Sequence, residues 1–232
     1  MGAKIRKSPA RARARARILV VDDHPIVRQG LQKLIDEEKD LVVCGEAEGF
    51  LDAEAALHDL DPDLVIIDIS LKQGDGMQLV KTVRARYPRL PILVLSMHDE
   101  VIYAERVLAA GANGYIMKQA DSAELLRALR RVLGDGTYVS EAIADTMVRN
   151  LSASGRHLAA NPIERLSNRE LQVLQMIGSG LSTRQAAAAL SLSMKTVESH
   201  RERIKRKLHL STGSQLLQFA LNWSERSGAG SA

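Results

Sequence analysis

The sequence contains one cysteine, Cys44, and no apolar run long enough to cross a membrane. A single cysteine cannot form a disulfide within the chain, which fits a reducing compartment, and its position in LVVCGEA predicts a small buried strand residue. A membrane-spanning helix needs roughly 20 apolar residues, far more than any run present. Only ILVV follows the basic N-terminal region before the first acids, too little for a secretory signal. We therefore expect a soluble cytoplasmic protein with no membrane partner.

Several ligand-binding patterns are also absent. The chain lacks the glycine-rich loop GxxxxGK followed by Ser or Thr, so a bound nucleotide is not indicated. It has no internal repeat of roughly 20 to 50 residues, which excludes a repeat array. His24 and His98 have no Cys or His partners at metal-ligand spacing, so we expect both to be surface histidines rather than zinc ligands.

Charge is present but unevenly distributed along the chain. Residues 1–17 contain seven Lys and Arg and no acid, residues 18–134 contain thirteen basic and twenty acidic side chains, and residues 165–210 contain nine and three. The formal net charge of +4 therefore combines an acidic middle with two basic ends. This asymmetry predicts two domains, one of which contacts a polyanion, although charge alone leaves nucleic acid and a membrane surface both open.

The acidic middle alternates short apolar runs with helical patterns. Helical periodicity is visible where Val27, Leu31 and Ile35 share one face. Continuous apolar strands joined by helical crossovers predict a doubly wound, five-stranded parallel sheet buried on both faces, an α/β fold. The five strand-length runs are 18–21, 41–45, 64–68, 92–96 and 114–118.

Polar residues stand where these predicted strands end. Asp22 and Asp23 end the first strand, Asp68 the third, Ser96 the fourth and Lys118 the fifth. The carboxyl ends of parallel strands share one edge of the sheet, where ligands bind. Adjacent carboxylates resist joint burial unless a cation sits between them, and three carboxylates suit Mg²⁺. Asp68 can then attack a phosphoryl group whose charge a metal and a lysine neutralise.

The motifs VVDDHP, VIIDIS, LSMHDE and GYIMK resemble, in order and spacing, those of the receiver domain of two-component response regulators. The resemblance implies a flavodoxin-like fold with Asp68 as the phosphoacceptor. It also implies a Mg²⁺ site formed by Asp22, Asp23, Asp68 and the backbone carbonyl of Ser70. One departure is Lys72, which stands where family members often carry proline.

The same resemblance assigns switching roles to three other residues. Ser96 and Lys118 are implied to sense the phosphoryl group, and Tyr115 to swing inward when Ser96 moves. A core tyrosine without a switching role remains the alternative for Tyr115.

After a connection at residues 135–162, the pattern is all-helical. SEAIADTMVRNL can continue as a helix, whereas SASGRHLAANP is typical of a linker. Ser167, Ser182 and Ser193 are predicted N-caps. The alanine-rich AAAAL, the turn LSLS and a long basic helix together predict a helix-turn-helix unit. The four expected helices lie in SNRELQVLQMI, STRQAAAALS, SMKTVESHRERIKRKL and TGSQLLQFALNW.

The long basic helix has one apolar and one polar face. Val197, Ile204 and Leu208 fall within about 40° of one another at 100° per residue. On the polar side, Lys and Arg can bind phosphates, while Ser199 and Glu202 can contact base edges. A solvated surface helix is the alternative, which the preceding helix-turn unit disfavours. The candidate DNA-binding residues are Lys195, Thr196, Glu198, Ser199, His200, Glu202, Arg203 and Arg206.

The stretch from LSNRELQ to KRKLHL resembles the four-helix DNA-binding domain of LuxR-type regulators, so the whole chain is similar to the NarL/FixJ class. This implies a recognition helix at about 194–208 in the DNA major groove, two half-sites, and a homodimer aided by SQLLQFALNW. A sensor histidine kinase and RNA polymerase are the implied protein partners. The implied division is a basic arm at 1–16, a receiver domain at 17–134, a linker at 135–162, a DNA-binding domain at 163–224 and a disordered tail at 225–232.

The arm RARARARAR has no counterpart in either resemblance. It can add sequence-independent phosphate contacts or be an inert extension, and its composition alone also fits an organelle transit peptide.

Taken together, the sequence predicts a transcription regulator switched by phosphorylation and not an enzyme. Two alternatives remain. A Mg²⁺-dependent phosphotransferase acting on a small molecule would need a substrate pocket, and no second set of catalytic residues is evident. A constitutive DNA-binding protein, whose receiver domain only mediates dimerisation, is disfavoured by the complete acidic set.

Overall fold

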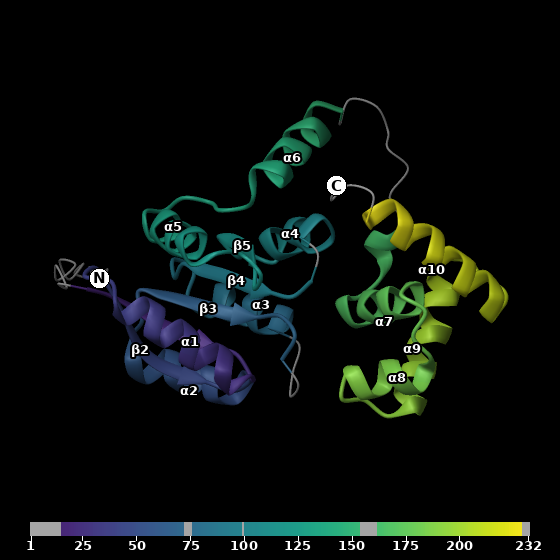
Figure 1. The fold of residues 1–232 in the computed structure, drawn as a ribbon, viewed down its shortest axis with the longest axis horizontal. Helices are drawn as coiled ribbons and strands as arrows, with labels where there is room; N and C mark the ends of the chain where they lie inside the picture. Colours follow the sequence, from purple (N-terminus) through teal and green to yellow (C-terminus); the bar gives the residue numbers. More distant parts are fainter. Residues whose placement is uncertain (1–14, 72–75, 99, 154–161, 229–232) are drawn as a thin grey trace, which may run out of the picture.

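The computed structural model describes residues 15–71, 76–98, 100–153 and 162–228. Within them a five-stranded sheet with helices on both faces is followed by a group of helices, α7 to α10, which lies beside the sheet domain (Figure 1). None of the helices in this described part of the chain has the length and apolarity that crossing a membrane requires.

All five strands of the sheet are parallel, in the order β2-β1-β3-β4-β5. The predicted runs are confirmed as strands, with small shifts at their ends. β1 begins before Ile18 because Ala16 and Arg17 pair with Leu41 and Val42 of β2. The strands are β1 Ala16–Val21, β2 Leu41–Ala47, β3 Leu64–Asp68, β4 Ile92–Ser96 and β5 Gly114–Met117.

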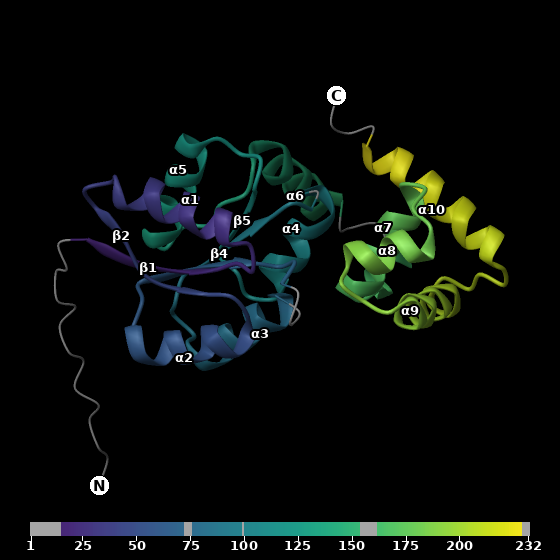
Figure 2. The ribbon, with the colours of Figure 1, turned by 60° about the horizontal axis from the view of Figure 1, so that its bottom comes forward.

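Successive side chains of the central strands enter two different hydrophobic clusters, so the sheet is covered on both faces. Val65 and Ile67 of β3 pack with α2, α3 and α4, whereas Leu64 and Ile66 pack with α1 and α5. Figure 2 shows α1 and α5 on one side of the sheet and α2 and α3 on the other. These helices are α1 Pro25–Asp36, α2 Phe50–Leu60, α3 Gly76–Arg86, α4 Glu100–Ala109 and α5 Ser122–Leu133.

The chain then runs beside β5 before it leaves the sheet. Tyr138 forms a parallel bridge with Gly114, and its carbonyl accepts a hydrogen bond of 2.9 Å from the amide of Tyr115. A Cβ atom at Gly114 would lie 2.9 Å from the Tyr138 oxygen, so glycine is required for this close approach. Helix α6, Glu141–Ala153, follows and packs against α4 through the buried Ile143.

The helical domain contains the short 3-10 helix η1 Pro162–Arg165 and four α-helices, as the sequence predicts. Ser167, Ser182 and Ser193 are confirmed as N-caps, because each side chain accepts a hydrogen bond from the backbone amide three residues later. The helices are α7 Asn168–Gly178, α8 Thr183–Ala189, α9 Met194–Lys207 and α10 Gly213–Gly228.

Three expectations need correction. Cys44 lies in β2 but is partly exposed, since β2 is an edge strand. The expected arm at 1–16 ends earlier, because Ala16 belongs to β1 and Arg15 donates to the carbonyls of Asp36 and Glu38. The expected disordered tail at 225–232 is helical as far as Gly228, because extending an existing helix costs less than starting one. Residues 1–14 and Lys72 lie outside the described residues.

Glu170 joins the start of α7 to the end of α9. Its buried carboxylate accepts a hydrogen bond of 2.7 Å from the amide of Ser167 and lies 2.6 Å from Lys207 Nζ. Burial acts to raise the pKa of Glu170, but the ammonium of Lys207 and the hydrogen bond from Ser167 hold it below its ordinary value.

Replacing Glu170 by glutamine should lower the free energy of unfolding at pH 7 by about 1–3 kcal/mol, because a charged buried hydrogen bond is lost. The pKa of Glu170 is lower in the folded chain than in the unfolded chain, where it is about 4.3. The ionised carboxylate therefore stabilises the fold above about pH 4.3, and this stabilisation is lost as the pH falls through the folded-state pKa. The difference between wild type and variant should therefore shrink between pH 7 and pH 3. Urea unfolding followed by Trp223 fluorescence measures it, with exposed Glu105→Gln as control. A difference independent of pH would contradict this role.

Candidate functional site

The carboxyl ends of β1 and β3 bring three aspartates to one edge of the sheet. The two strands are neighbours, so Asp22 and Asp23 after β1 lie beside Asp68 at the end of β3. Ligand atoms of these three residues and of His24 all lie within 4.8 Å of one another. Asp22 and Asp68 are each 1% exposed, so two of the carboxylates are almost completely removed from water. Such a group requires a cation nearby.

Lys118 supplies one cation. Its Nζ lies 2.6 Å from Asp22 Oδ2 and 2.8 Å from Asp68 Oδ2, and its side chain is 9% exposed. Burial alone would lower the pKa of Lys118, but Asp68 and Asp22 outweigh this effect and raise it. Burial raises the pKa of Asp68 above its ordinary value, and Lys118 opposes the increase. The lysine therefore holds two buried carboxylates together across the sheet edge.

His24 contacts the other side of the aspartate pair. Its Nδ1 lies 3.0 Å from Asp22 Oδ1 and 2.9 Å from Asp23 Oδ1, and its backbone amide donates to Asp22 Oδ1 at 2.9 Å. His24 is exposed, as expected of a surface histidine, and its ring also contacts the acidic cluster, which was not expected from the sequence. Its place directly after the two acids is the sequence signal that could have indicated this.

The donor atoms at this edge suit a hard divalent cation. They are carboxylate oxygens, the ligands that Mg²⁺ prefers. Ser70 lies just after Asp68, and its backbone amide donates a hydrogen bond of 2.8 Å to Asp68 Oδ1. A Cβ atom at Gly76 would lie 2.2 Å from the Asp68 carbonyl oxygen, so glycine allows α3 to begin against this backbone. The residues present therefore fit a magnesium ion.

Ser96 and Tyr115 meet at the backbone of His98. Ser96 is completely buried, and its Oγ accepts a hydrogen bond of 3.0 Å from the His98 amide. The Tyr115 hydroxyl donates to the His98 carbonyl at 2.6 Å, and the tyrosine is also completely buried. Tyr115 is therefore already buried in this structure, as the alternative of a core tyrosine expects.

The His98 ring connects the sheet domain to the helical domain. Its Nε2 lies 3.1 Å from Ser70 Oγ and 3.0 Å from Gln172 Nε2 of α7, and the ring stacks on Tyr103 with 4.7 Å between centroids. Burial, with the positive charges of Arg169 and Lys118, lowers the pKa of His98 to about 4. The ring is therefore neutral at pH 7 and can accept a hydrogen bond. His98 is only partly exposed, so the expectation of a surface histidine is wrong for this residue, and no local signal indicates the contact with Gln172.

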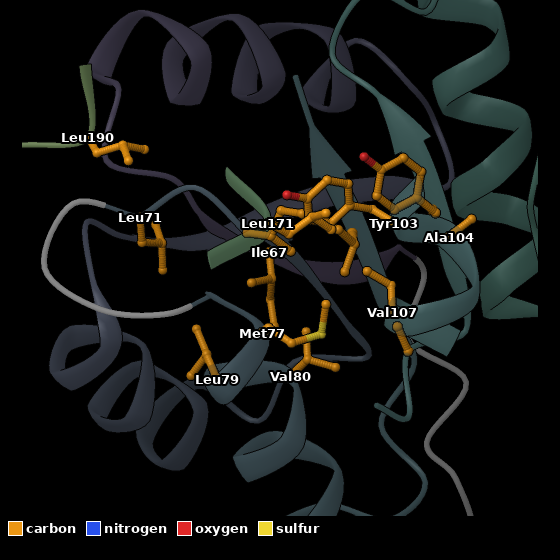
Figure 3. Close-up of a cluster of buried hydrophobic side chains, with 14 of the residues drawn as sticks. Ile67, Leu71, Met77, Leu79, Val80, Tyr103, Ala104, Val107, Leu171 and Leu190 are labelled. Carbon is orange, nitrogen blue, oxygen red and sulfur yellow. The ribbon is translucent and has the colours of Figure 1, made fainter. Parts of the chain in front are cut away.

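Further contacts join α4 to the helical domain. The Tyr103 hydroxyl donates to Gln175 Oε1 at 3.2 Å, and the Arg106 guanidinium donates to the carbonyls of Leu166 and Ile163. Figure 3 shows Leu171 and Leu190 of the helical domain in the same hydrophobic cluster as side chains of the sheet domain. Both polar and apolar contacts therefore hold α7 against α4.

The polar face of α9 remains accessible in this arrangement. Val197 and Ile204 are buried and Leu208 is partly buried, as the helical pattern predicts. Thr196 and His200 are only partly exposed. The candidate DNA-binding residues that are exposed are Lys195, Glu198, Ser199, Glu202, Arg203 and Arg206.

The two acids on this face have neighbouring partners. Glu198 accepts a hydrogen bond of 2.8 Å from Thr183 Oγ1, and Glu202 lies 2.8 Å from Lys205 Nζ. Neither acid is therefore without a polar partner on this face.

Comparison with known proteins matches both parts of the chain. Residues 18–130 match the response regulator receiver domain, and residues 164–220 match the bacterial regulatory proteins of the luxR family. Oxygen regulatory protein NreC of Staphylococcus aureus is 32% identical over 209 residues, which cover 88% of this chain and 96% of NreC.

Solved structures of response regulators are also similar to this chain. Salmonella enterica serovar Typhimurium RcsB, bound to promoter rprA in the presence of the phosphomimetic BeF3⁻, is 28% identical with a TM-score of 0.58, covering 89% of this chain and 98% of that chain. A two-component response regulator of the LuxR family from an Aurantimonas species is 33% identical with a TM-score of 0.56, covering 60% and 99%.

Proposed function

Because this chain belongs to the response regulators with a LuxR-type DNA-binding domain, the NarL/FixJ class, we propose that phosphorylation of Asp68 switches its binding to promoter DNA. One observation carries the proposal: Asp22, Asp23, Asp68 and Lys118 lie together at one edge of the sheet, in a chain that also exposes the polar face of the basic helix α9. We assign residues 17–134 to the receiver domain, 135–162 to the linker and 163–224 to the DNA-binding domain.

In the proposed reaction an Asp68 carboxylate oxygen attacks the phosphorus of a phosphohistidine on a sensor kinase, or of a small phosphodonor. The bond between phosphorus and the donor atom breaks, and its electron pair leaves with the donor. Mg²⁺ held by Asp22, Asp23, Asp68 and the carbonyl of Ser70 would supply neutralisation of the transferred charge. Lys118 Nζ, which contacts Asp68 in this structure, would bind a phosphoryl oxygen.

The contacts of His98 support a route from this reaction to the DNA-binding domain. A phosphoryl group on Asp68 would draw Ser96 Oγ away from the His98 amide that it now binds. Tyr115, which donates to the His98 carbonyl, would shift with it. Because the His98 ring contacts Gln172, these movements would loosen α7 from the face formed by residues 97–120.

The released domain would then bind DNA as a dimer. Leu217 and Leu221 of α10 are 44% and 40% exposed, so this helix offers an apolar face to a second copy. Two α9 helices would enter the major groove at two half-sites, and RNA polymerase would be the downstream partner.

Intact-mass measurement with a small phosphodonor tests the chemistry. The full chain should gain one phosphoryl group per molecule in the presence of Mg²⁺ and almost none when the metal is chelated. Continuous release of phosphate from small substrates, many equivalents per chain, would instead favour a phosphotransferase.

Loosening the contact between domains should weaken the switch. In Arg106→Ala/Gln172→Ala, three hydrogen bonds between α4 or His98 and the helical domain are removed. The DNA affinity of the unphosphorylated chain should rise about three- to tenfold, because the contact no longer restrains the helical domain. The increase in DNA affinity on phosphorylation should become smaller by the same factor. Fluorescence anisotropy with promoter DNA measures both, and exposed Arg127→Ala serves as control. If the ratio of DNA affinities with and without phosphorylation were the same as in wild type, these contacts would not restrain DNA binding.

A further inference from the structure

Arg28 has an unusual environment beside the acidic edge. Its side chain is only 9% exposed, as little as that of Lys118. Its Nε lies 2.8 Å from Glu46 Oε2 and one terminal nitrogen lies 2.6 Å from Glu48 Oε1. The other terminal nitrogen donates a hydrogen bond of 2.7 Å to the backbone carbonyl of Asp22. A buried guanidinium thus joins α1 to the end of β2 and to the turn after β1.

The hydrogen bond to Asp22 fixes the geometry of the aspartate pair. That carbonyl belongs to the planar peptide group linking Asp22 to Asp23, so its direction determines where the Cα atom and the carboxylate of Asp23 lie. The amide of Asp22 is held separately, by a bond of 3.1 Å to the carbonyl of Ala47. Strand β2 therefore holds one side of Asp22, and Arg28 holds the other.

Glu46 and Glu48 keep the guanidinium in this place. Burial alone would lower the pKa of Arg28, but its pairing with the two glutamates outweighs this effect and raises it, so the side chain stays charged. Two of its donors are fixed by carboxylates while the third reaches the Asp22 carbonyl. Lysine cannot reproduce this arrangement, because its ammonium has no planar fork of donors.

We propose that Arg28 is a positioning residue for the metal site: it orients the peptide between Asp22 and Asp23 so that both carboxylates, with Asp68, bind one divalent cation. The proposal rests on the proposed function of the acidic edge and deepens it.

Two effects of removing Arg28 have opposite signs. Loss of its positive charge would strengthen the attraction of this edge for Mg²⁺. Loss of the hydrogen bond would disorder the peptide and weaken metal binding. If Arg28 is a positioning residue, losing its hydrogen bond to the Asp22 carbonyl weakens Mg²⁺ binding more than losing its charge strengthens it. The direction of the change in Mg²⁺ affinity therefore distinguishes the two effects.

Titration of the full chain with MgCl₂, followed by NMR shifts of backbone amides, tests the inference without any phosphodonor. Arg28→Lys and Arg28→Gln should each raise the Mg²⁺ dissociation constant about tenfold, and the amide of Asp23 should shift even before metal is added. Arg130→Gln is the matched control. Arg130 also pairs with two acids, Glu38 and Asp40, but near the start of β2 at the opposite edge of the sheet. The Arg130→Gln variant should bind Mg²⁺ with the same affinity as wild type.

Wild-type affinity in Arg28→Lys, or tighter binding in Arg28→Gln, would overturn the positioning role. Failure of wild type itself to bind Mg²⁺ would instead overturn the proposed function. If the Arg28 variants do not fold, Glu46→Gln/Glu48→Gln, which removes two anchors of the guanidinium, replaces them. A loss of affinity that persists in about 0.5 M salt supports positioning, because charge effects over this distance are then screened. If the loss of Mg²⁺ affinity disappears at this salt concentration, the positioning role of Arg28 is overturned.

Discussion

Replacing Asp68 by asparagine should abolish covalent incorporation of phosphate from a small phosphodonor. Asparagine has nearly the same shape, but its amide cannot act as the oxygen nucleophile that a carboxylate provides. Intact-mass measurement should therefore find one phosphoryl group on wild type and none on the variant. Asp59→Asn, which changes an exposed acid of α2 that pairs with His58, should retain wild-type incorporation.

The same substitution should leave the fold intact. Burial raises the pKa of Asp68, so its ionised form destabilises the folded chain at pH 7. This free-energy cost disappears only when the pH falls below the raised pKa. A neutral amide removes this cost, although Lys118 loses one of its two partners. The unfolding temperature of Asp68→Asn should therefore equal or exceed that of wild type. Phosphate incorporation by a folded variant would place the acceptor elsewhere.

Removing two positive charges from α9 should have the second large effect. Lys195 lies in the first turn of the helix and Arg206 in the last, and both are exposed. Lys195→Ala/Arg206→Ala should weaken binding to all DNA sequences about 10- to 100-fold near 0.1 M salt, because two phosphate contacts are lost. The slope of log affinity against log salt should fall by about 2.

The matched control is Lys33→Ala/Lys39→Ala, which removes two exposed lysines from the sheet domain. Its affinity and salt slope should match those of wild type. If the α9 variant bound as tightly as wild type at low salt, α9 would not be the DNA-contacting helix.

The sheet could be predicted from sequence because its strands are nearly continuous apolar runs. A strand buried on both faces leaves this pattern without reference to any partner. Once the strands were placed, parallel topology alone brought Asp22, Asp23 and Asp68 to the same edge. The capping serines could also be predicted from sequence, because an N-cap side chain bonds to the backbone only three residues away.

Contacts between distant segments could not be predicted in this way. His98 and Gln172 lie on different domains, and nothing near either residue indicates that they meet. The pairing of Arg28 with Glu46 likewise depends on how α1 packs against β2. One signal was available, however: Arg28 shares the helical face of the buried Leu31 and Ile35, where a charged residue requires partners.

The most direct measurement compares DNA affinity and molecular mass of the wild-type chain before and after phosphorylation, at one salt concentration. Anisotropy with promoter DNA and light scattering should show about tenfold tighter binding and a shift from monomer to dimer once Asp68 carries the phosphoryl group. A chain that is fully phosphorylated yet binds DNA with the same affinity and has the same mass would contradict a switch at Asp68.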